Sequence, residues 1–148
     1  MQVKDIMHKG AYSAAPETGI RHVAAMMAEQ DIGCIPVVDG GKLAGVITDR
    51  DIACRVVAAG QDCSDVTAEK VMSKEVIFCR EAEEIGDAVH IMENNQVRRL
   101  PVIDADDHLT GMLSLGDVSH GTSREMTGEM VKAVSAHHED PQLLKSAG

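Results

Sequence analysis

Apolar residues recur at helical spacing in two places along the chain. In both places they fall at i, i+3, i+4 and i+7, which puts them on one face of a helix. The positions are Ile20, Val23, Ala24 and Met27, and then Ile85, Ala88, Val89 and Met92. Two short apolar runs follow each helix, at 35–38 and 43–47 and again at 100–103 and 109–113. Their lack of alternation predicts strands of a sheet covered by helices on one face and by a second sheet on the other.

The whole pattern is a tandem repeat. A shift of 65 residues places Ile6-Met7 on Val71-Met72 and CIPVVD (34–39) on RLPVID (99–104). Beyond that point the shift is 66, which aligns GVITDRD (45–51) with GMLSLGD (111–117). The extra residue falls in the polar turn between the two strands, where an insertion costs little.

Each copy therefore predicts a β-α-β-β-α unit, with its first strand near 12–14 and 76–79. The expected fold class is α/β (α+β), with two repeats related by a pseudo-twofold axis and stacked sheets flanked by helices. The sequence divides into repeat 1 at 1–62, repeat 2 at 63–122, and a C-terminal segment at 123–148. That last segment predicts a helix near Arg124–Val134 and a polar, mobile tail.

Composition excludes several classes of partner. The net charge is −10, and the chain has one tyrosine, one phenylalanine and no tryptophan. Nucleic-acid binders normally carry a basic patch and stacking aromatics, so we expect no nucleic-acid or anionic-membrane partner. Apolar runs are shorter than the ~18 residues of a membrane span, and MQVKDIMHK is not a signal peptide, so we expect a cytoplasmic protein.

The repeated heptapeptide has two compatible interpretations. Thr48 with Asp51, and Ser114 with Asp117, fit a capping box at a helix start, with a hydroxyl at N-cap and a carboxylate at N3. The same groups can hold a ligand, because a helix N-terminus and a hydroxyl bind phosphate and a carboxylate accepts both hydrogens of a ribose diol. The leading glycines, 45 and 111, permit a tight approach within the strand.

These motifs resemble those of a pair of cystathionine-β-synthase (CBS) domains. The resemblance rests on DIM and KVM, on IPVVD and LPVID, and on GVITDRD and GMLSLGD, and it covers about residues 1–120. The flanks TDRDIACRVVAAG and MENNQVRRLPVI are most similar to short stand-alone bacterial CBS-pair proteins, including the hypoxic-response type.

The resemblance implies adenosine derivatives bound in clefts between the two repeats. It assigns the ribose hydroxyls to Asp51 and Asp117, and phosphate or ribose contacts to Thr48 and Ser114. The residues implied at the adenine are Ile35, Pro36, Leu100 and Pro101, and those implied at the phosphates are Arg50, Arg98 and Arg99. The first copy has Gly33-Cys34 in place of the arginine pair, and the second has Gly116 in place of Arg50, so the sites are unequal.

The resemblance also implies a regulatory function. The expected ligand is an adenine nucleotide, AMP, ADP or ATP, with NAD(H) or S-adenosylmethionine as further options. The arginines modestly favour a phosphate-bearing ligand. We expect a homodimer that acts in trans on another protein. The chain contains no nucleophile elbow, phosphate-binding lysine loop or G-x-G-x-x-G, so we expect no enzymatic activity and no catalytic residues.

Two alternative functions stay open from sequence. One is a constitutive dimerisation or scaffold module without a ligand, whose motifs serve only as helix caps. The other is a thiol- or metal-responsive sensor that uses the cysteines, Cys34, Cys54, Cys63 and Cys79. No Cys or His spacing typical of a metal site is present, so we predict no metal ligand.

Overall fold

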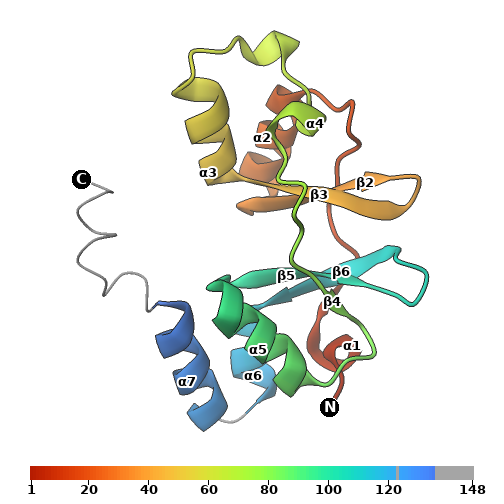
Figure 1. Ribbon diagram of the computed structural model, residues 1–148, viewed down its shortest axis with the longest axis vertical. Helices are drawn as coiled ribbons and strands as arrows, with labels where there is room; N and C mark the ends of the chain where they lie inside the picture. The colour runs from red at the N-terminus through yellow and green to blue at the C-terminus, as the bar shows by residue number, and fades with distance from the viewer. Residues whose placement is uncertain (123, 136–148) are drawn as a thin grey trace. The chain divides into compact units, whose positions relative to one another are not determined.

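The computed structural model describes residues 1–122 and 124–135, and the chain forms two compact units (Figure 1). The first, called here the GVITDRD unit, comprises residues 11–76 and 107–109. The second, called the GMLSLGD unit, comprises, of the described residues, 1–10, 77–106, 110–122 and 124–135. Each unit contains one copy of the repeated heptapeptide and has its own hydrophobic core.

The GVITDRD unit is built on an antiparallel hairpin. Its elements are α2 (Ile20–Gln30), β2 (Cys34–Asp39), β3 (Lys42–Thr48), α3 (Asp49–Ile52), a π-helical turn (Ala53–Val57), a 3₁₀ turn (Cys63–Asp65) and α4 (Ala68–Val71). Strands β2 and β3 pair with Ile35 opposite Ile47. Single bridges extend the hairpin on both sides, Ala14 to Val37 in parallel and Ser73 to Val46 antiparallel.

The GMLSLGD unit repeats this arrangement with longer edge pairing. Its elements are α1 (Val3–Ile6), β1 (His8–Lys9), β4 (Cys79–Arg80), α5 (Ile85–Asn95), β5 (Arg99–Ile103), β6 (Leu109–Ser114), α6 (Leu115–Gly121) and α7 (Arg124–Val134). The sheet order is β1-β6-β5-β4, with β1 antiparallel to β6 and β4 parallel to β5. In Figure 1 the helices of each unit lie on one side of its sheet.

The predicted helix faces form the two cores. In α2 the side chains of Ile20, Val23 and Met27 are buried, and Ala24 is half-buried. In α5 all four predicted positions are buried, namely Ile85, Ala88, Val89 and Met92. Burial of such side chains is the main favourable term in folding, so the period of the sequence pattern determines which helix face meets the sheet. The mixed α and β fold with helix-flanked sheets is confirmed.

The opening helix of each repeat packs with the later elements of the other repeat. The amide of Val3 donates to the carbonyl of Glu83 at 2.9 Å, and the amide of Ile85 donates to that of Met1 at 3.0 Å. In the other unit, the amide of Ala68 donates to the carbonyl of Thr18 at 2.7 Å. Residues 1–10 therefore belong to the GMLSLGD unit, and residues up to 76 belong to the GVITDRD unit.

Three local predictions differ in outcome. The strand expected at 12–14 is reduced to a single bridge at Ala14, while the one expected at 76–79 is the two-residue β4. The helix at Arg124–Val134 is confirmed as α7. The predicted tail lies, from residue 136 on, outside the described residues. Within the described residues, no helix is long and apolar enough to cross a membrane.

Candidate functional site

Both heptapeptides form a capping box. In the GVITDRD unit, the amide of Thr48 donates to Oδ2 of Asp51 at 2.9 Å, and the amide of Asp51 donates to Oγ1 of Thr48 at 3.1 Å. In the GMLSLGD unit, the amide of Ser114 donates to Oδ2 of Asp117 at 2.9 Å, and the amide of Asp117 donates to the Ser114 hydroxyl oxygen at 3.0 Å. The capping interpretation is thus confirmed for α3 and α6.

Capping leaves groups of each motif available for a ligand. The carboxylates use only Oδ2 for the cap, and both are partly exposed. Within the described residues, Oδ1 of Asp117 has no hydrogen-bond partner, whereas Oδ1 of Asp51 lies 3.9 Å from Nε of Arg55. The hydroxyl hydrogens of Thr48 and Ser114 are not used by the cap, because these oxygens act there as acceptors.

The motif glycines lie where a second segment pairs antiparallel with the strand. A Cβ on Gly111 would clash with the backbone carbonyl oxygen of His8 in β1. A Cβ on Gly45 would lie 2.5 Å from Sδ of Met72 and 3.0 Å from the carbonyl oxygen of Ser73. The predicted tight approach is confirmed, and the approaching segment in each case is the one that follows the opening helix.

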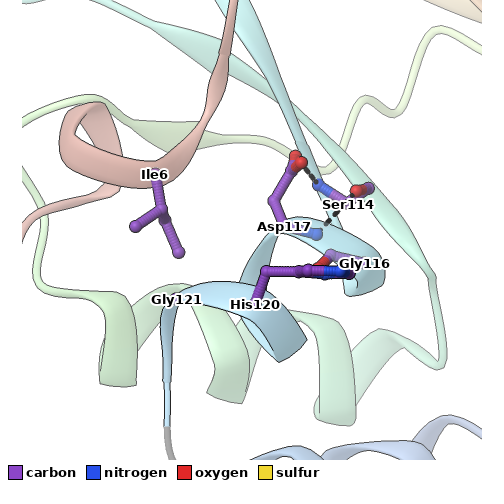
Figure 2. A pocket seen from close by; sticks show the side chains of 6 residues that line it. All are labelled: Ile6, Ser114, Gly116, Asp117, His120 and Gly121. Atoms are coloured by element: carbon purple, nitrogen blue, oxygen red, sulfur yellow. Dashed lines mark hydrogen bonds between the residues drawn. The ribbon is translucent and has the colours of Figure 1, made fainter.

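A cavity of about 490 Å³ adjoins the second motif, entirely within the GMLSLGD unit. It is lined by Ile6, Ser114, Gly116, Asp117, His120 and Gly121. Figure 2 shows Ile6 of α1 on one side of the cavity and the capping pair Ser114 and Asp117 on the other. The motif hydroxyl and carboxylate therefore stand at a concave surface of mixed polarity.

His120 is a lining residue that the sequence interpretation missed. Its Nδ1 lies 2.8 Å from the carbonyl oxygen of Gly116. Since a carbonyl oxygen only accepts, Nδ1 carries the hydrogen and Nε2 of the neutral ring remains an acceptor. The sequence signal was its position three residues after Asp117, which places both side chains on the same side of α6. Ile6 was also missed as a lining residue, because it is distant in sequence.

The predicted basic residues are distributed unequally around the motifs. The carbonyl of Arg98 accepts from the amide of Leu115 at 2.9 Å, which brings Arg98 to the first turn of α6. Arg98 and its neighbour Arg99 both have exposed side chains. In the other unit the carbonyl of Gly33 takes this place and accepts from Asp49 at 3.0 Å. Arg50 is exposed in the first turn of α3.

The apolar residues predicted at the adenine lie inside the cores. Ile35 and Leu100 are fully buried, and Pro36 and Pro101 are buried beside them on β2 and β5. These residues anchor β2 and β5. The residue before each strand, Gly33 or Arg98, is hydrogen-bonded to the motif. Their contact with an adenine stays a prediction.

The cysteines differ in environment, and no disulfide joins any of the four. Cys54 is exposed, whereas Cys79 is fully buried in β4. Burial and, to a smaller extent, the carboxylate of Glu83 raise the pKa of the Cys79 thiol to about 12. Cys79 is therefore a core residue that stays protonated, unlike the low-pKa, accessible thiols used in redox sensing.

Comparison with known proteins identifies the family. The family model of the CBS domain matches residues 3–57 and 66–121. The CBS domain-containing protein YhcV of Bacillus subtilis is 37% identical over 134 residues, which cover 90% of this chain and 94% of that protein. A crystal structure of Hypoxic Response Protein I with two coordinated zinc ions is 31% identical, with a TM-score of 0.77 over 83% of this chain and all of that chain.

A further solved structure carries adenosine ligands. The CBS domain pair of protein MJ0100, in complex with 5′-methylthioadenosine and S-adenosyl-L-methionine, is 30% identical, with a TM-score of 0.70 over 81% of this chain and 94% of that chain. The residues matched by the family model, 3–57 and 66–121, include both capping motifs and the buried residues of both cores. The chain belongs to the CBS domain family, with one CBS domain matched in each repeat.

Proposed function

We propose that this CBS pair is a regulatory module that binds an adenosine-containing ligand at the second motif. The observation that carries the proposal is the cavity of about 490 Å³ whose wall includes both Ser114 and Asp117. Small-molecule pockets commonly measure about 300–1,000 Å³ and combine apolar walls with a few polar groups. The cavity has this size, and Ile6 supplies an apolar wall opposite the polar pair.

Each polar group has a role in this proposal that is compatible with the helix cap. Oδ2 of Asp117 keeps its bond to the Ser114 amide, and Oδ1 accepts from a ribose hydroxyl. The Ser114 hydroxyl donates its hydrogen to a ribose or phosphate oxygen. Arg98 and Arg99 approach the phosphates from the strand end that is hydrogen-bonded to Leu115. Two exposed cations favour a phosphate-bearing ligand such as AMP, ADP or ATP over S-adenosylmethionine, although NAD(H) also fits this chemistry.

The regulatory part of the proposal rests on the family. The MJ0100 pair binds adenosine compounds, and this chain is 30% identical to it. The two matched CBS domains carry the proposed ligand site, and we infer that the effect of the ligand is exerted on a separate protein. We further propose that the module is a non-catalytic cytoplasmic homodimer. A ligand acts in such a module only if it binds two states of the protein with unequal affinity.

A thermal-shift panel followed by calorimetry tests the proposal. The ligands are AMP, ADP, ATP, NADH and S-adenosylmethionine, with GTP as the control for the base. At a hundred times its Kd, a ligand adds about 2.7 kcal/mol per site, which raises the Tm by several degrees. A rise with adenine ligands and none with GTP supports the proposal.

A pair of variants then locates the site. Asp117→Ala should weaken AMP binding about tenfold to a hundredfold, because a charge-assisted acceptor worth about 1.5–3 kcal/mol is lost. Asp5→Ala is the matched control. Asp5 caps α1 with the same geometry, its Oδ2 accepting from the Gln2 amide at 2.8 Å, but it does not line the cavity. Equal AMP affinity in both variants would contradict the assigned role of Asp117.

One observation favours a second function, that of a scaffold without a ligand. The capping boxes are complete on their own, so the motifs have a structural role in any case. A scaffold predicts a flat panel on protein freed of co-purified nucleotide. It also predicts that Asp117→Ala and Asp5→Ala each cost only helix-cap stability, about 0.5–2 kcal/mol.

A further inference from the structure

The two motifs differ one helical turn after the aspartate. Four residues after Asp51 stands Arg55, and four residues after Asp117 stands Gly121. Residues four apart are neighbours on a helix surface, so this position faces the motif carboxylate in both units. At equivalent positions of the repeat, the first copy therefore has the long cationic side chain of Arg55, and the second has only the hydrogen atom of Gly121.

In the GVITDRD unit, Arg55 bridges the motif to α4. Its Nη1 donates to the carbonyl oxygen of Val71 at 3.0 Å, and its Nε lies 3.9 Å from Oδ1 of Asp51. Oδ1 is the carboxylate oxygen that the helix cap leaves available. The Asp51 side chain is 20% exposed, and that of Arg55 is 52% exposed.

In the GMLSLGD unit, the equivalent space is part of the cavity. The repeat places Ile6 at the position of Val71, and both Ile6 and Gly121 line the cavity. A Cβ on Gly121 would lie 2.7 Å from Cγ2 of Ile6, so a larger side chain fits there only if the Ile6 side chain shifts. Where Arg55 connects α4 to the first motif, the second motif has open volume (Figure 2).

The charges near the two motifs also differ, and they disfavour a phosphate at the first motif. In the GVITDRD unit, a Cβ on Gly33 would lie 2.9 Å from Oδ2 of Asp49, so this carboxylate stands where the other unit has the Arg98 side chain. The carboxylates of Asp49 and Asp51 therefore oppose a phosphate at the first motif. Leu115 replaces Asp49 in the second motif, and Asp117 is its single carboxylate.

We propose that Arg55 acts as an internal counter-ion that closes the first motif, so that the chain binds one adenosine ligand, at the second motif. This inference rests on the function proposed above and adds its stoichiometry and a residue that determines it. Arg55 neutralises Asp51 and occupies the space into which a ribose hydroxyl would reach. Removal of the side chain should expose Oδ1 of Asp51 and open a second site.

Calorimetry on the full chain tests this with AMP and with uncharged adenosine. The wild type should bind about one AMP per chain. Asp117→Ala should reduce that affinity at least tenfold, while Asp51→Ala should leave it within about twofold. Arg55→Ala should add a second event, clearest with adenosine because Asp49 does not repel a neutral ligand. Arg21→Ala is the matched control, since it removes an exposed arginine of α2 in the same unit, one to which no ligand contact is assigned.

The outcomes separate the two proposals. The proposal that Arg55 closes the first motif is wrong if the wild type binds two ligands and Asp51→Ala removes one. It is also wrong if Arg55→Ala keeps the wild-type stoichiometry with both AMP and adenosine. If the wild type binds neither probe but Arg55→Ala binds one, and Arg55→Ala/Asp51→Ala loses it, then the closure is supported and the proposed second-motif site fails. If no variant binds either probe, both proposals are wrong.

Discussion

At the scale of single residues, the two motif aspartates make the same helix cap but have different surroundings. Asp51 and Asp117 cap their helices with the same oxygen and nearly the same distances. Their second oxygens differ, because one faces Arg55 and the other faces a cavity. In our proposal, the function of each motif aspartate therefore depends on the residue four positions further along the chain.

The candidate site was predictable in part from sequence. The hydroxyls and carboxylates could be identified because their spacing is local and occurs twice. His120, Gly121 and Ile6 could not, because a cavity depends on which distant segment packs beside the motif. The roles assigned to the arginines and to the adenine-contacting residues stay predictions.

The buried thiol of Cys79 should make the free energy of unfolding depend on pH in the alkaline range. Burial raises its pKa from 9.0 to about 12. Below pH 9 the thiol is protonated in both states, but between pH 9 and 12 only the unfolded chain loses the proton. The free energy of unfolding should therefore fall as pH rises through this range, by up to about 1.4 kcal/mol per pH unit.

Urea unfolding at several pH values from 8 to 11 measures this slope. Cys79→Ala should make it shallower, while Cys54→Ala, which removes an exposed thiol, should leave it unchanged. An identical slope in wild type and Cys79→Ala would mean that other groups cause the pH dependence.

At the scale of helices and strands, the repeat predicts most of the fold. The two long helices, both hairpins and α7 follow from apolar spacing, because each element must bury one face against a sheet. The π-helical turn at Ala53–Val57 has no such signal, since it widens one turn without changing which residues are apolar. The first strand shrinks to one bridge at Ala14, whose amide donates to Pro36 and whose carbonyl accepts from Val38.

The pairing of β1 with β6 makes Gly111 a sensitive position. Gly111→Ala should lower the free energy of unfolding by about 1–3 kcal/mol, because the new methyl meets the backbone oxygen of His8, which cannot move alone. Gly128→Ala in α7 is the control, since a Cβ there meets nothing within 4 Å, and it should raise stability by about 0.5–1 kcal/mol. Urea denaturation of both variants measures the difference. A neutral Gly111→Ala would show that β1 does not hold this position.

At the scale of the whole molecule, the compact units are not contiguous in sequence. The core of the GVITDRD unit includes Val66, Ala68 and Val71, which all lie beyond residue 62. The buried Val3, by contrast, belongs to the core of the GMLSLGD unit. The repeat boundary at 62/63 stays a prediction about the duplicated sequence. The packing indicates a different folding unit, residues 11–76, and this difference can be tested.

Two fragments distinguish these divisions. Residues 11–76 contain the whole core of the GVITDRD unit and should unfold cooperatively in urea and resist limited proteolysis. Residues 1–62 lack α4 and should show no cooperative transition. Equal behaviour of the two fragments would contradict the idea that α4 completes this core.

The exchanged opening helices have a consequence for how such a gene can be rearranged. A crossover at the end of the first repeat, near residue 62, would separate both cores from their first helices at once. Crossovers near residues 10 and 76 would instead move one complete core as a cassette. A single sequence repeat gained or lost by recombination at residue 62 would need an opening helix from its neighbour, whereas the segment 11–76 already contains the helix that completes its core.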